Sequence, residues 1–185
     1  MKKSMMIVIG IVVFLILMVA SMYNGLVKLE ESVNSGYASI EADLQRRADL
    51  IPNLVSTVKQ YAKHEKEVFA DVTESREKLM GAKTPEDLSE AAAEMTSSLG
   101  RLIAIGESYP ELKANENFIN LQDELAGTEN RIAVSRKDYN VLVKKYNASI
   151  KTFPKVILAG MFGFDKKDYF EAKEGAENVP SVDFE

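Results

Sequence analysis

The N-terminal part of the chain follows two hydrophobic patterns in succession. Residues 5–22 (MMIVIGIVVFLILMVASM) contain no charged side chain. Eighteen helical residues span about 27 Å, close to the hydrocarbon thickness of a bilayer. The pattern then changes to apolar residues at steps of three or four, which is typical of an amphipathic helix. These apolar positions are Leu26, Leu29, Val33, Tyr37, Ile40, Leu44 and Ala48. The sequence therefore predicts one helix from about residue 5 to about residue 48.

Residues 5–22 fit a membrane anchor better than a secretory signal peptide. Lys2 and Lys3 would suit either one, but the apolar stretch is long for a signal peptide and no clear small-residue cleavage site follows it. The positive-inside rule places the basic N-terminal end in the cytoplasm. We therefore expect residues 1–22 to be an uncleaved anchor that crosses the cell membrane once, through residues 5–22. The rest of the chain is expected on the extracytoplasmic side.

Three further helices are expected after the first. Asp49 and Pro52 have the residue types of a helix cap and a first turn, so a second helix is expected to begin there. One kinked helix through Pro52 is the less favoured alternative. Thr84 and Pro85 predict the cap and first position of a third helix, and Pro154 ends the fourth. The expected ranges are 49–81, 84–106, and from between 109 and 115 to 153.

Four helices joined by short turns, without strand-like alternation, predict an all-α protein. Its fold class would be a single N-terminal transmembrane helix followed by an up-and-down four-helix bundle with long helices, over residues 23–154. The fourth helix then returns to the membrane side near Phe153. Residues 155–185 form a tail that is apolar at first and acidic afterwards. The segment FPKVILAGMFGF is too short and too interrupted to span a membrane, so it either covers the open end of the bundle or lies at the lipid interface beside the anchor.

Composition narrows the possible functions. The 185 residues include no Cys, no Trp and one His, and their net charge is −5. Disulfides and thiolate chemistry are therefore excluded, and nucleic acid is not expected as a partner, because phosphate binding needs a basic surface. His64, Glu67 and Asp71 would share one helix face, where a solvated charged surface is much more expected than a divalent-ion site. Since nucleotide-binding and nucleophile motifs are also missing, we expect no enzymatic activity, no metal and no cofactor.

Two polar clusters are denser than solubility requires. One surrounds the expected start of the second helix, and the other lies within the fourth helix. The favoured interpretation is structural: Arg46 or Arg47 would pair with Asp49 at a turn, and Glu129 would pair with an arginine to join two helices. A partner-binding surface is the alternative. The candidate residues are Arg46, Arg47, Asp49, Asn53, Glu129, Arg131, Arg136, Tyr139 and Asn140.

Several motifs along the chain resemble the signature of the LemA family. They are RRADLIPNLV at residues 46–55, VKQYA with His64-Glu65, ENRI at 129–132, Tyr139-Asn140, Tyr146-Asn147, Phe153-Pro154 and Pro180-x-Val182-Asp-Phe184. The resemblance implies a bacterial membrane protein with one span and four long helices, without enzymatic activity or cofactor. The family includes a magnetosome protein and often accompanies TPM-domain membrane proteins. It therefore implies a membrane protein partner of that type, with a homo-oligomer as the alternative.

Two functions from different classes remain. The favoured one is a membrane-anchored scaffold or adaptor, whose polar helices present surfaces to another protein or to copies of itself. Arg131, Arg136 and Asn140 would give such a protein a basic strip on an otherwise acidic body, which favours acidic partners. The alternative is an extracytoplasmic ligand sensor of helical-bundle type. A sensor would need an apolar cavity with convergent polar groups and a cytoplasmic output domain, and the basic segment before the span is too short to be one.

Overall fold

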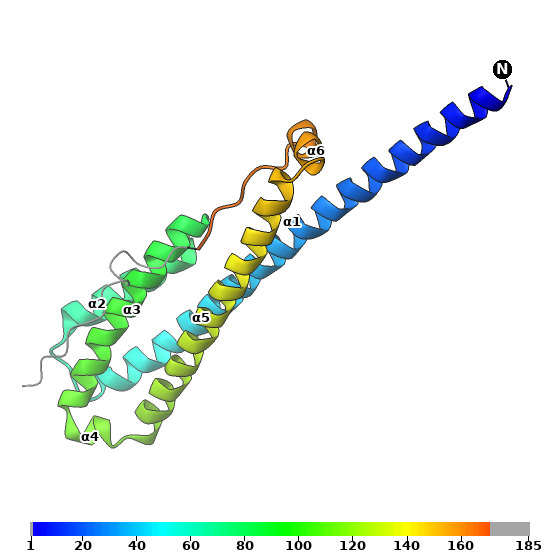
Figure 1. Ribbon diagram of the computed structural model, residues 1–185. Helices are drawn as coiled ribbons and strands as arrows, with labels where there is room; N and C mark the ends of the chain where they lie inside the picture. The colour runs from blue at the N-terminus through cyan, green and yellow to red at the C-terminus, as the bar shows by residue number, and fades with distance from the viewer. Residues whose placement is uncertain (1, 171–185) are drawn as a thin grey trace, which may run out of the picture. The chain divides into compact units, whose positions relative to one another are not determined.

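The computed structural model describes residues 2–170, and the all-α prediction is confirmed for them. No β-strand occurs among these residues, whose helices are labelled in Figure 1. The predicted acidic end of the tail and the motif at residues 180–184 lie outside the described part of the chain. The helices are α1 (Lys2–Lys59), α2 (Lys66–Gly81), α3 (Pro85–Ser108), α4 (Pro110–Lys113), α5 (Glu116–Lys151) and α6 (Lys155–Phe162).

The described residues divide into two compact units. Unit 1 contains residues 2–39 and 137–169, and unit 2 contains residues 40–136 together with Phe170. The two longest helices, α1 and α5, contribute residues to both units, whereas α2, α3 and α4 belong to unit 2 and α6 belongs to unit 1.

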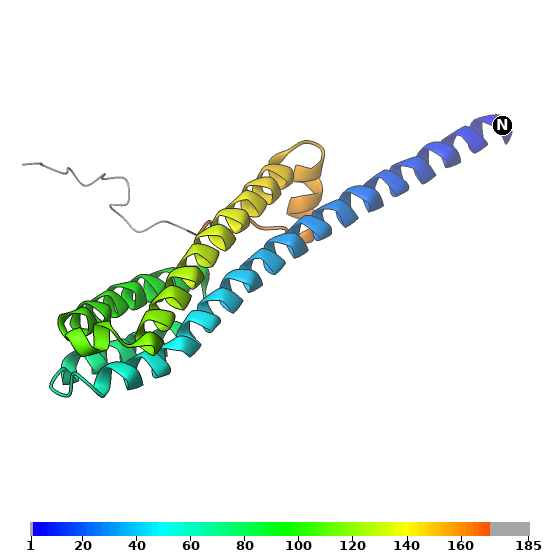
Figure 2. The ribbon, with the colours of Figure 1, turned by 90° about the horizontal axis from the view of Figure 1, so that it is seen from below.

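Unit 2 packs segments of four helices around an apolar core. Residues 40–59 of α1 and 116–136 of α5 accompany α2 and α3, which lie side by side in both ribbon views (Figure 1 and Figure 2). The cap predicted for the third helix is confirmed, since the Asp87 N–H donates to the Thr84 Oγ1 at 3.1 Å and Pro85 occupies the first turn. The fully buried side chains of this core include Ile40, Leu44, Ile51, Leu54, Met95, Leu99, Leu102, Phe118 and Ile132.

The prediction that a new helix begins at Asp49 is wrong, because α1 continues through Pro52 to Lys59. Proline has no N–H, so the carbonyl of Ala48, four residues earlier, loses its helical partner. The Arg76 Nε–H of α2 donates to that carbonyl at 2.9 Å and replaces the missing bond. Asp49 caps no helix; its carboxylate accepts a hydrogen bond from the Gln45 Nε2 at 2.8 Å.

The chain instead leaves the helix at residues 60–65, between α1 and α2. This segment contains neither Gly nor Pro. The N–H groups of Tyr61 and Ala62 both donate to the Val58 carbonyl, at 3.0 and 2.9 Å, and tighten the last turn of α1. The Tyr61 hydroxyl also accepts a hydrogen bond from Asn115 Nδ2 at 3.1 Å. His64 lies in this turn, before α2 begins at Lys66. The prediction that His64 shares a helix face with Glu67 and Asp71 is therefore wrong.

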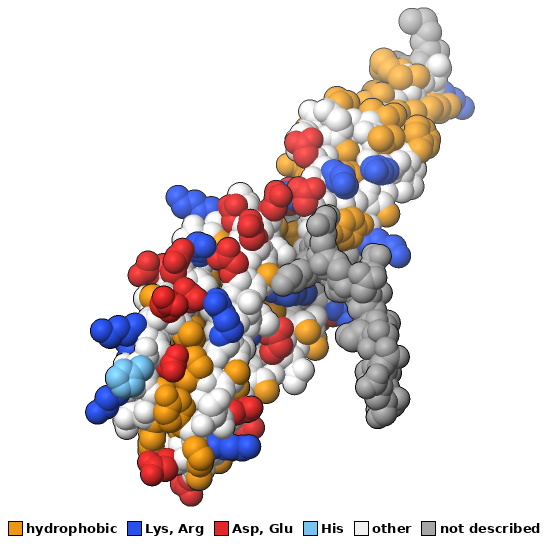
Figure 3. Space-filling model, turned by 90° about the vertical axis from the view of Figure 1, so that its left-hand side faces the viewer, with side chains coloured by type: hydrophobic (Ala, Val, Ile, Leu, Met, Phe, Trp, Pro, Cys, Tyr) orange, Lys and Arg blue, Asp and Glu red, His pale blue; other side chains and the backbone are white. Residues whose placement is uncertain are grey.

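Unit 1 pairs the early part of α1 with the end of α5. The large apolar side chains from Met5 to Leu17 are 48–65% exposed, and α1 is the one described helix long and apolar enough to cross a membrane, with a mean hydropathy of 3.0 over its most apolar stretch. On the face in Figure 3, hydrophobic side chains gather towards this end of the chain. The described part of the tail contains α6. Helix α6 ends at Phe162, and the next residue, Gly163, has a φ of +74°, which suits glycine. The chain changes direction there and continues into residues 164–170.

Candidate functional site

Arg47 joins three helices inside unit 2. Its side chain is buried, and its Nη1 donates to the Glu129 carboxylate of α5 and to the Thr96 Oγ1 of α3, the latter at 3.2 Å. The expected pairing of Glu129 with an arginine of another helix is therefore confirmed. The Asp49 carboxylate instead accepts a hydrogen bond from Gln45 and forms no ion pair with Arg46 or Arg47 among the described residues. Burial lowers the pKa of the Arg47 guanidinium, and the Glu129 carboxylate opposes this change. Arg47 thus serves the packing of unit 2.

Arg136 lies close to the same carboxylate but is held by an aromatic ring. Its guanidinium carbon is 4.6 Å from the centre of the Phe170 ring, within cation–π range. Burial is the main cause that lowers the pKa of Arg136; Glu129 raises this pKa and Arg47 lowers it further. The Arg136 Nε is buried and has no hydrogen-bond partner among the described residues. The Glu129 carboxylate therefore interacts electrostatically with two guanidinium groups, those of Arg47 and Arg136.

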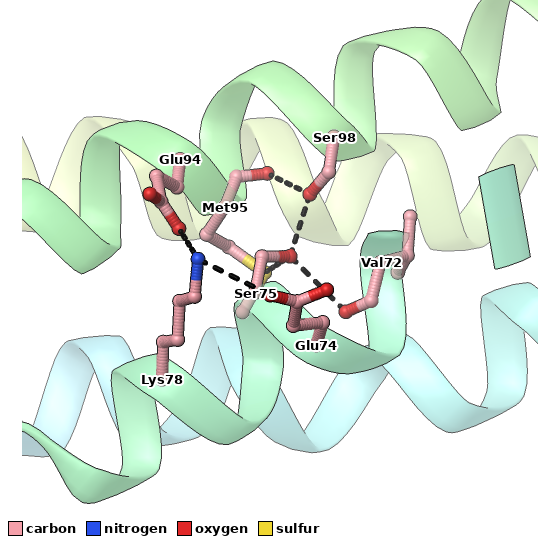
Figure 4. Close-up of polar contacts among 7 residues, drawn as sticks. All are labelled: Val72, Glu74, Ser75, Lys78, Glu94, Met95 and Ser98. Carbon is pink, nitrogen blue, oxygen red and sulfur yellow. Dashed lines mark hydrogen bonds and ion pairs between the residues drawn. The ribbon is translucent and has the colours of Figure 1, made fainter. Parts of the chain in front are cut away.

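A buried serine pair connects α2 with α3, as Figure 4 shows. The hydroxyl oxygens of Ser75 and Ser98 are 2.7 Å apart, so one hydroxyl donates to the other. The accepting hydroxyl donates in turn to a carbonyl of its own helix, that of Val72 or of Met95, at 3.1 Å. At the edge of this contact, Lys78 forms ion pairs with Glu94 at 2.9 Å and with Glu74 at 3.3 Å. These serines are not among the candidates predicted from the sequence. The signal that could have found them is a small polar residue within the apolar stripe of each helix.

In unit 1, side chains of α5 hold the extended segment that follows α6. Asn147 is buried, and its amide bonds to both backbone groups of Lys167: the Oδ1 accepts from the N–H at 3.0 Å, and the Nδ2 donates to the carbonyl at 2.8 Å. The Tyr139 hydroxyl donates to the Asp168 carbonyl at 3.0 Å. Lys167 also pairs with Glu30 of α1 at 2.8 Å. Tyr139, a candidate for partner binding, therefore positions residues 164–169.

The remaining candidates differ in exposure. Arg131 lines a shallow groove on α5 together with Asp123 and Glu124, so the surface around it carries both signs of charge. Asn140 is half-buried and takes part in an interaction within the protein. Of the arginines in the proposed basic strip, Arg131 is exposed and Arg136 is half-buried. The exposed candidates are Arg46, Asp49, Asn53 and Arg131.

The candidate residues thus fall into two classes. Arg47, Glu129, Arg136 and Tyr139 take part in packing within one or the other unit. The other candidates are exposed, apart from Asn140, which is half-buried. Within residues 2–170, no group of three or more His, Cys, Asp or Glu side chains is arranged to hold a metal ion.

Comparison with known proteins finds relatives among magnetosome and LemA proteins. Magnetosome proteins MamQ 1 and MamQ 2 of Paramagnetospirillum magneticum (strain AMB-1) are each 26% identical over 181 residues, which cover 84% of this chain and 66% of theirs. Protein LemA of Metamycoplasma hominis is 24% identical over 131 residues, covering 70% of this chain and 60% of that protein. The chain therefore spans just under two thirds of the length of these curated relatives.

The family model covers most of the chain. The LemA family model matches residues 36–184, a range that includes α2 to α6, the second part of α1 and every candidate residue named above. The resemblance to the LemA family, which was inferred from short motifs, is therefore confirmed. This chain belongs to the LemA family.

Proposed function

We propose that this protein is a membrane-anchored scaffold or adaptor without catalytic activity, which organises other proteins at a membrane. The observation that carries the proposal is the continuity of α1. One helix joins an exposed apolar stretch of membrane-spanning length to residues whose buried faces form the cores of unit 1 and unit 2. Family membership and the magnetosome relatives support a role at a membrane.

The proposed partner surface is the exposed polar side of unit 2. Arg131 is an exposed cation on this side, and the groove beside it also contains Asp123 and Glu124. A partner with complementary charges would be guided there chiefly by electrostatic steering. Either a membrane protein of the TPM-domain type or a second copy of this chain would fill this role.

Crosslinking in intact membranes, followed by purification of the tagged full chain, tests the proposal. The wild type is expected to give an adduct of defined mass, and Arg131→Glu is expected to reduce its yield at least five-fold. Lys113→Glu is a matched charge reversal at an exposed position of α4 and is expected to leave the yield unchanged. Circular dichroism melts must agree among the three proteins. If the wild type gives no adduct of defined mass, the scaffold function is contradicted. If Arg131→Glu gives the same yield of adduct as the wild type, the partner binds at a surface that does not include Arg131.

The side of the membrane is a separate part of the proposal. Lys2 and Lys3 precede the span, so the positive-inside rule places the chain beyond the anchor, from residue 23 onward, outside the cytoplasm. A protease added to spheroplasts is expected to digest the chain beyond the anchor. Complete protection before lysis, followed by digestion after lysis, would reverse the orientation.

A further inference from the structure

Helix α6 exposes more apolar surface than the helical segments of unit 2. Its sequence, KVILAGMF, contains one charged residue, at its first position, and only Leu158 and Ala159 are buried. Met161 is 72% exposed, and Phe153, just before the helix, is 77% exposed. A contiguous apolar surface of this kind on a protein marks a contact with another molecule or with a membrane. The exposed apolar residues in and beside α6 are Phe153, Val156, Ile157, Met161 and Phe162.

Within unit 1, α6 lies beside the end of the apolar stretch of α1, as both ribbon views show (Figure 1 and Figure 2). The Phe162 ring packs edge-on against Tyr23, with ring centres 5.0 Å apart, and Phe164 contacts the same tyrosine at 5.6 Å. Between the two helices runs a groove whose walls are almost entirely apolar. It is lined by Leu15, Ile16, Val19, Ala20, Tyr23, Asn24 and Phe162.

From this arrangement we propose that α6 is a second membrane-contacting element, which lies in the bilayer interface beside the last turns of the anchor. The inference rests on the membrane anchoring in the proposed function. Because the groove is continuous with residues 15–22, any bilayer that surrounds the anchor extends to α6. Eight residues are too few to cross the hydrocarbon region, so α6 lies along the interface, and an acyl chain fills the groove.

The polar groups around α6 suit this position. Tyr23, a residue type that is enriched at membrane–water boundaries, packs against the Phe162 and Phe164 rings. Lys151 and Lys166 are exposed on either side of the helix along the chain, where their ammonium groups can reach lipid phosphates. The segment after α6 is held to α5 by Asn147 and Tyr139. Contact of α6 with lipid is therefore coupled to the packing of α1 and α5 in unit 1.

Single-cysteine variants of the full chain provide the test, since the natural sequence contains no cysteine. Met161→Cys reports on α6, Leu17→Cys on the anchor, and Lys137→Cys on an exposed position of α5 in the same unit. Lys137 lies fourteen residues before the end of α5, about 21 Å along the helix. Each variant carries a small fluorophore and is reconstituted into phosphatidylcholine vesicles, with nitroxide-labelled acyl chains as the lipid quencher and iodide as the aqueous quencher.

Lipid quenching at Met161 is expected to be within two-fold of that at Leu17, and iodide quenching at least five-fold weaker than at Lys137. If Leu17 is quenched by lipid while Met161 remains open to iodide, the inference is overturned and the anchor stands. If Met161 is shielded from both quenchers, protein covers α6, and the lipid contact is overturned. If Leu17 itself escapes lipid quenching, the membrane anchoring in the proposed function fails first. Ile157→Cys, also exposed on α6, repeats the measurement should the Met161 variant show an altered circular dichroism spectrum.

Discussion

Each unit contains part of α1 and part of α5, but different segments of the chain pack against these helices in the two units. In unit 2, α2 and α3 provide the cover, and the polar contacts between helices join side chain to side chain, as between Arg47 and Glu129 or Ser75 and Ser98. In unit 1 the cover includes the irregular residues 164–169, and α5 holds their backbone through side-chain-to-backbone hydrogen bonds, as between Asn147 and Lys167.

The physical reason for this difference lies in the backbone. A helix satisfies its own N–H and carbonyl groups, so helices that pack together need only match their side chains. An irregular segment has unpaired backbone groups that another residue must satisfy when they are buried, and the amide of Asn147 does so for Lys167. Pro52 is the exception in unit 2, because it frees one helical carbonyl, which Arg76 then satisfies.

The largest effect is expected at the buried ion pair of unit 2. Glu129→Leu leaves the buried Arg47 guanidinium without its carboxylate and is expected to lower the free energy of unfolding by about 3 kcal/mol. Arg47→Met should cost only about 1 kcal/mol, because the Glu129 side chain is 46% exposed and water can solvate the carboxylate left behind. Urea unfolding of the full chain in detergent micelles, followed by circular dichroism, measures both. Equal costs would show that Arg47 is as well solvated as Glu129.

Alanine substitutions at two glycines, one in each unit, test how tightly each unit is packed. In unit 2, a Cβ at Gly106 would overlap the fully buried Phe118 ring, so Gly106→Ala is expected to cost about 2 kcal/mol through overpacking. In unit 1, the close neighbour of Gly36 is the end of the flexible Leu142 side chain. Since alanine also favours the helix, Gly36→Ala should change stability by less than about 0.5 kcal/mol.

Gly100→Ala is the control for this pair, because nothing lies within 4 Å of a Cβ there. Helix propensity alone should stabilise that variant by about 1 kcal/mol. The same urea titrations apply. A Gly106→Ala protein as stable as Gly100→Ala would mean that Phe118 moves aside without loss, and that the core of unit 2 is no more tightly packed than unit 1.

A double-mutant cycle tests the exception at Pro52. Arg76→Met is expected to cost about 1.5 kcal/mol in the natural sequence, because the Ala48 carbonyl loses its replacement partner. In a Pro52→Ala background the restored N–H satisfies that carbonyl, and the cost should fall below about 0.5 kcal/mol. The difference of about 1 kcal/mol is the coupling between the two positions. Additive costs would show that Arg76 acts on stability independently of the proline.

The smallest effects are expected at two tyrosines of unit 1. Tyr139→Phe removes the hydrogen bond to the Asp168 carbonyl and should cost about 1 kcal/mol. Tyr146→Phe should cost almost nothing, because the buried Tyr146 hydroxyl has no hydrogen-bond partner among the described residues. Thermal melts of the two variants in detergent provide the comparison. A greater loss for Tyr146→Phe would reveal a partner for its hydroxyl.

The same tyrosines predict a pH dependence. Burial raises the pKa of Tyr139, with a further contribution from Asp168, and it raises the pKa of Tyr146, with contributions from Glu30 and Asp165. Above the ordinary tyrosine pKa of about 10, the unfolded chain loses protons that the folded protein keeps, so stability falls as the pH rises. Either phenylalanine variant should show a shallower alkaline fall than the natural protein. Identical slopes in all three would mean that these groups ionise alike in both states.

Local signals in the sequence determined the elements that local forces stabilise. The uncharged stretch at residues 5–22 predicted the exposed apolar part of α1, and Thr84 with Pro85 predicted the start of α3, because cap and proline effects act within one turn. The sequence also indicated that Glu129 would join an arginine of another helix, but it did not identify that arginine as Arg47, which it paired, as an alternative to Arg46, with Asp49. The family motifs were sufficient to predict the family.

The tertiary structure decided the features that depend on distant residues. Pro52 stays inside α1 because Arg76, far along the chain, replaces a hydrogen bond that the proline removes. The helix ends instead at a segment without Gly or Pro, where Tyr61 contacts Asn115. Asn147 binds a backbone twenty residues away. Each outcome depends on a partner that no local pattern identifies, since a side chain's hydrogen-bond partner across the fold is set by packing and not by its neighbours in sequence.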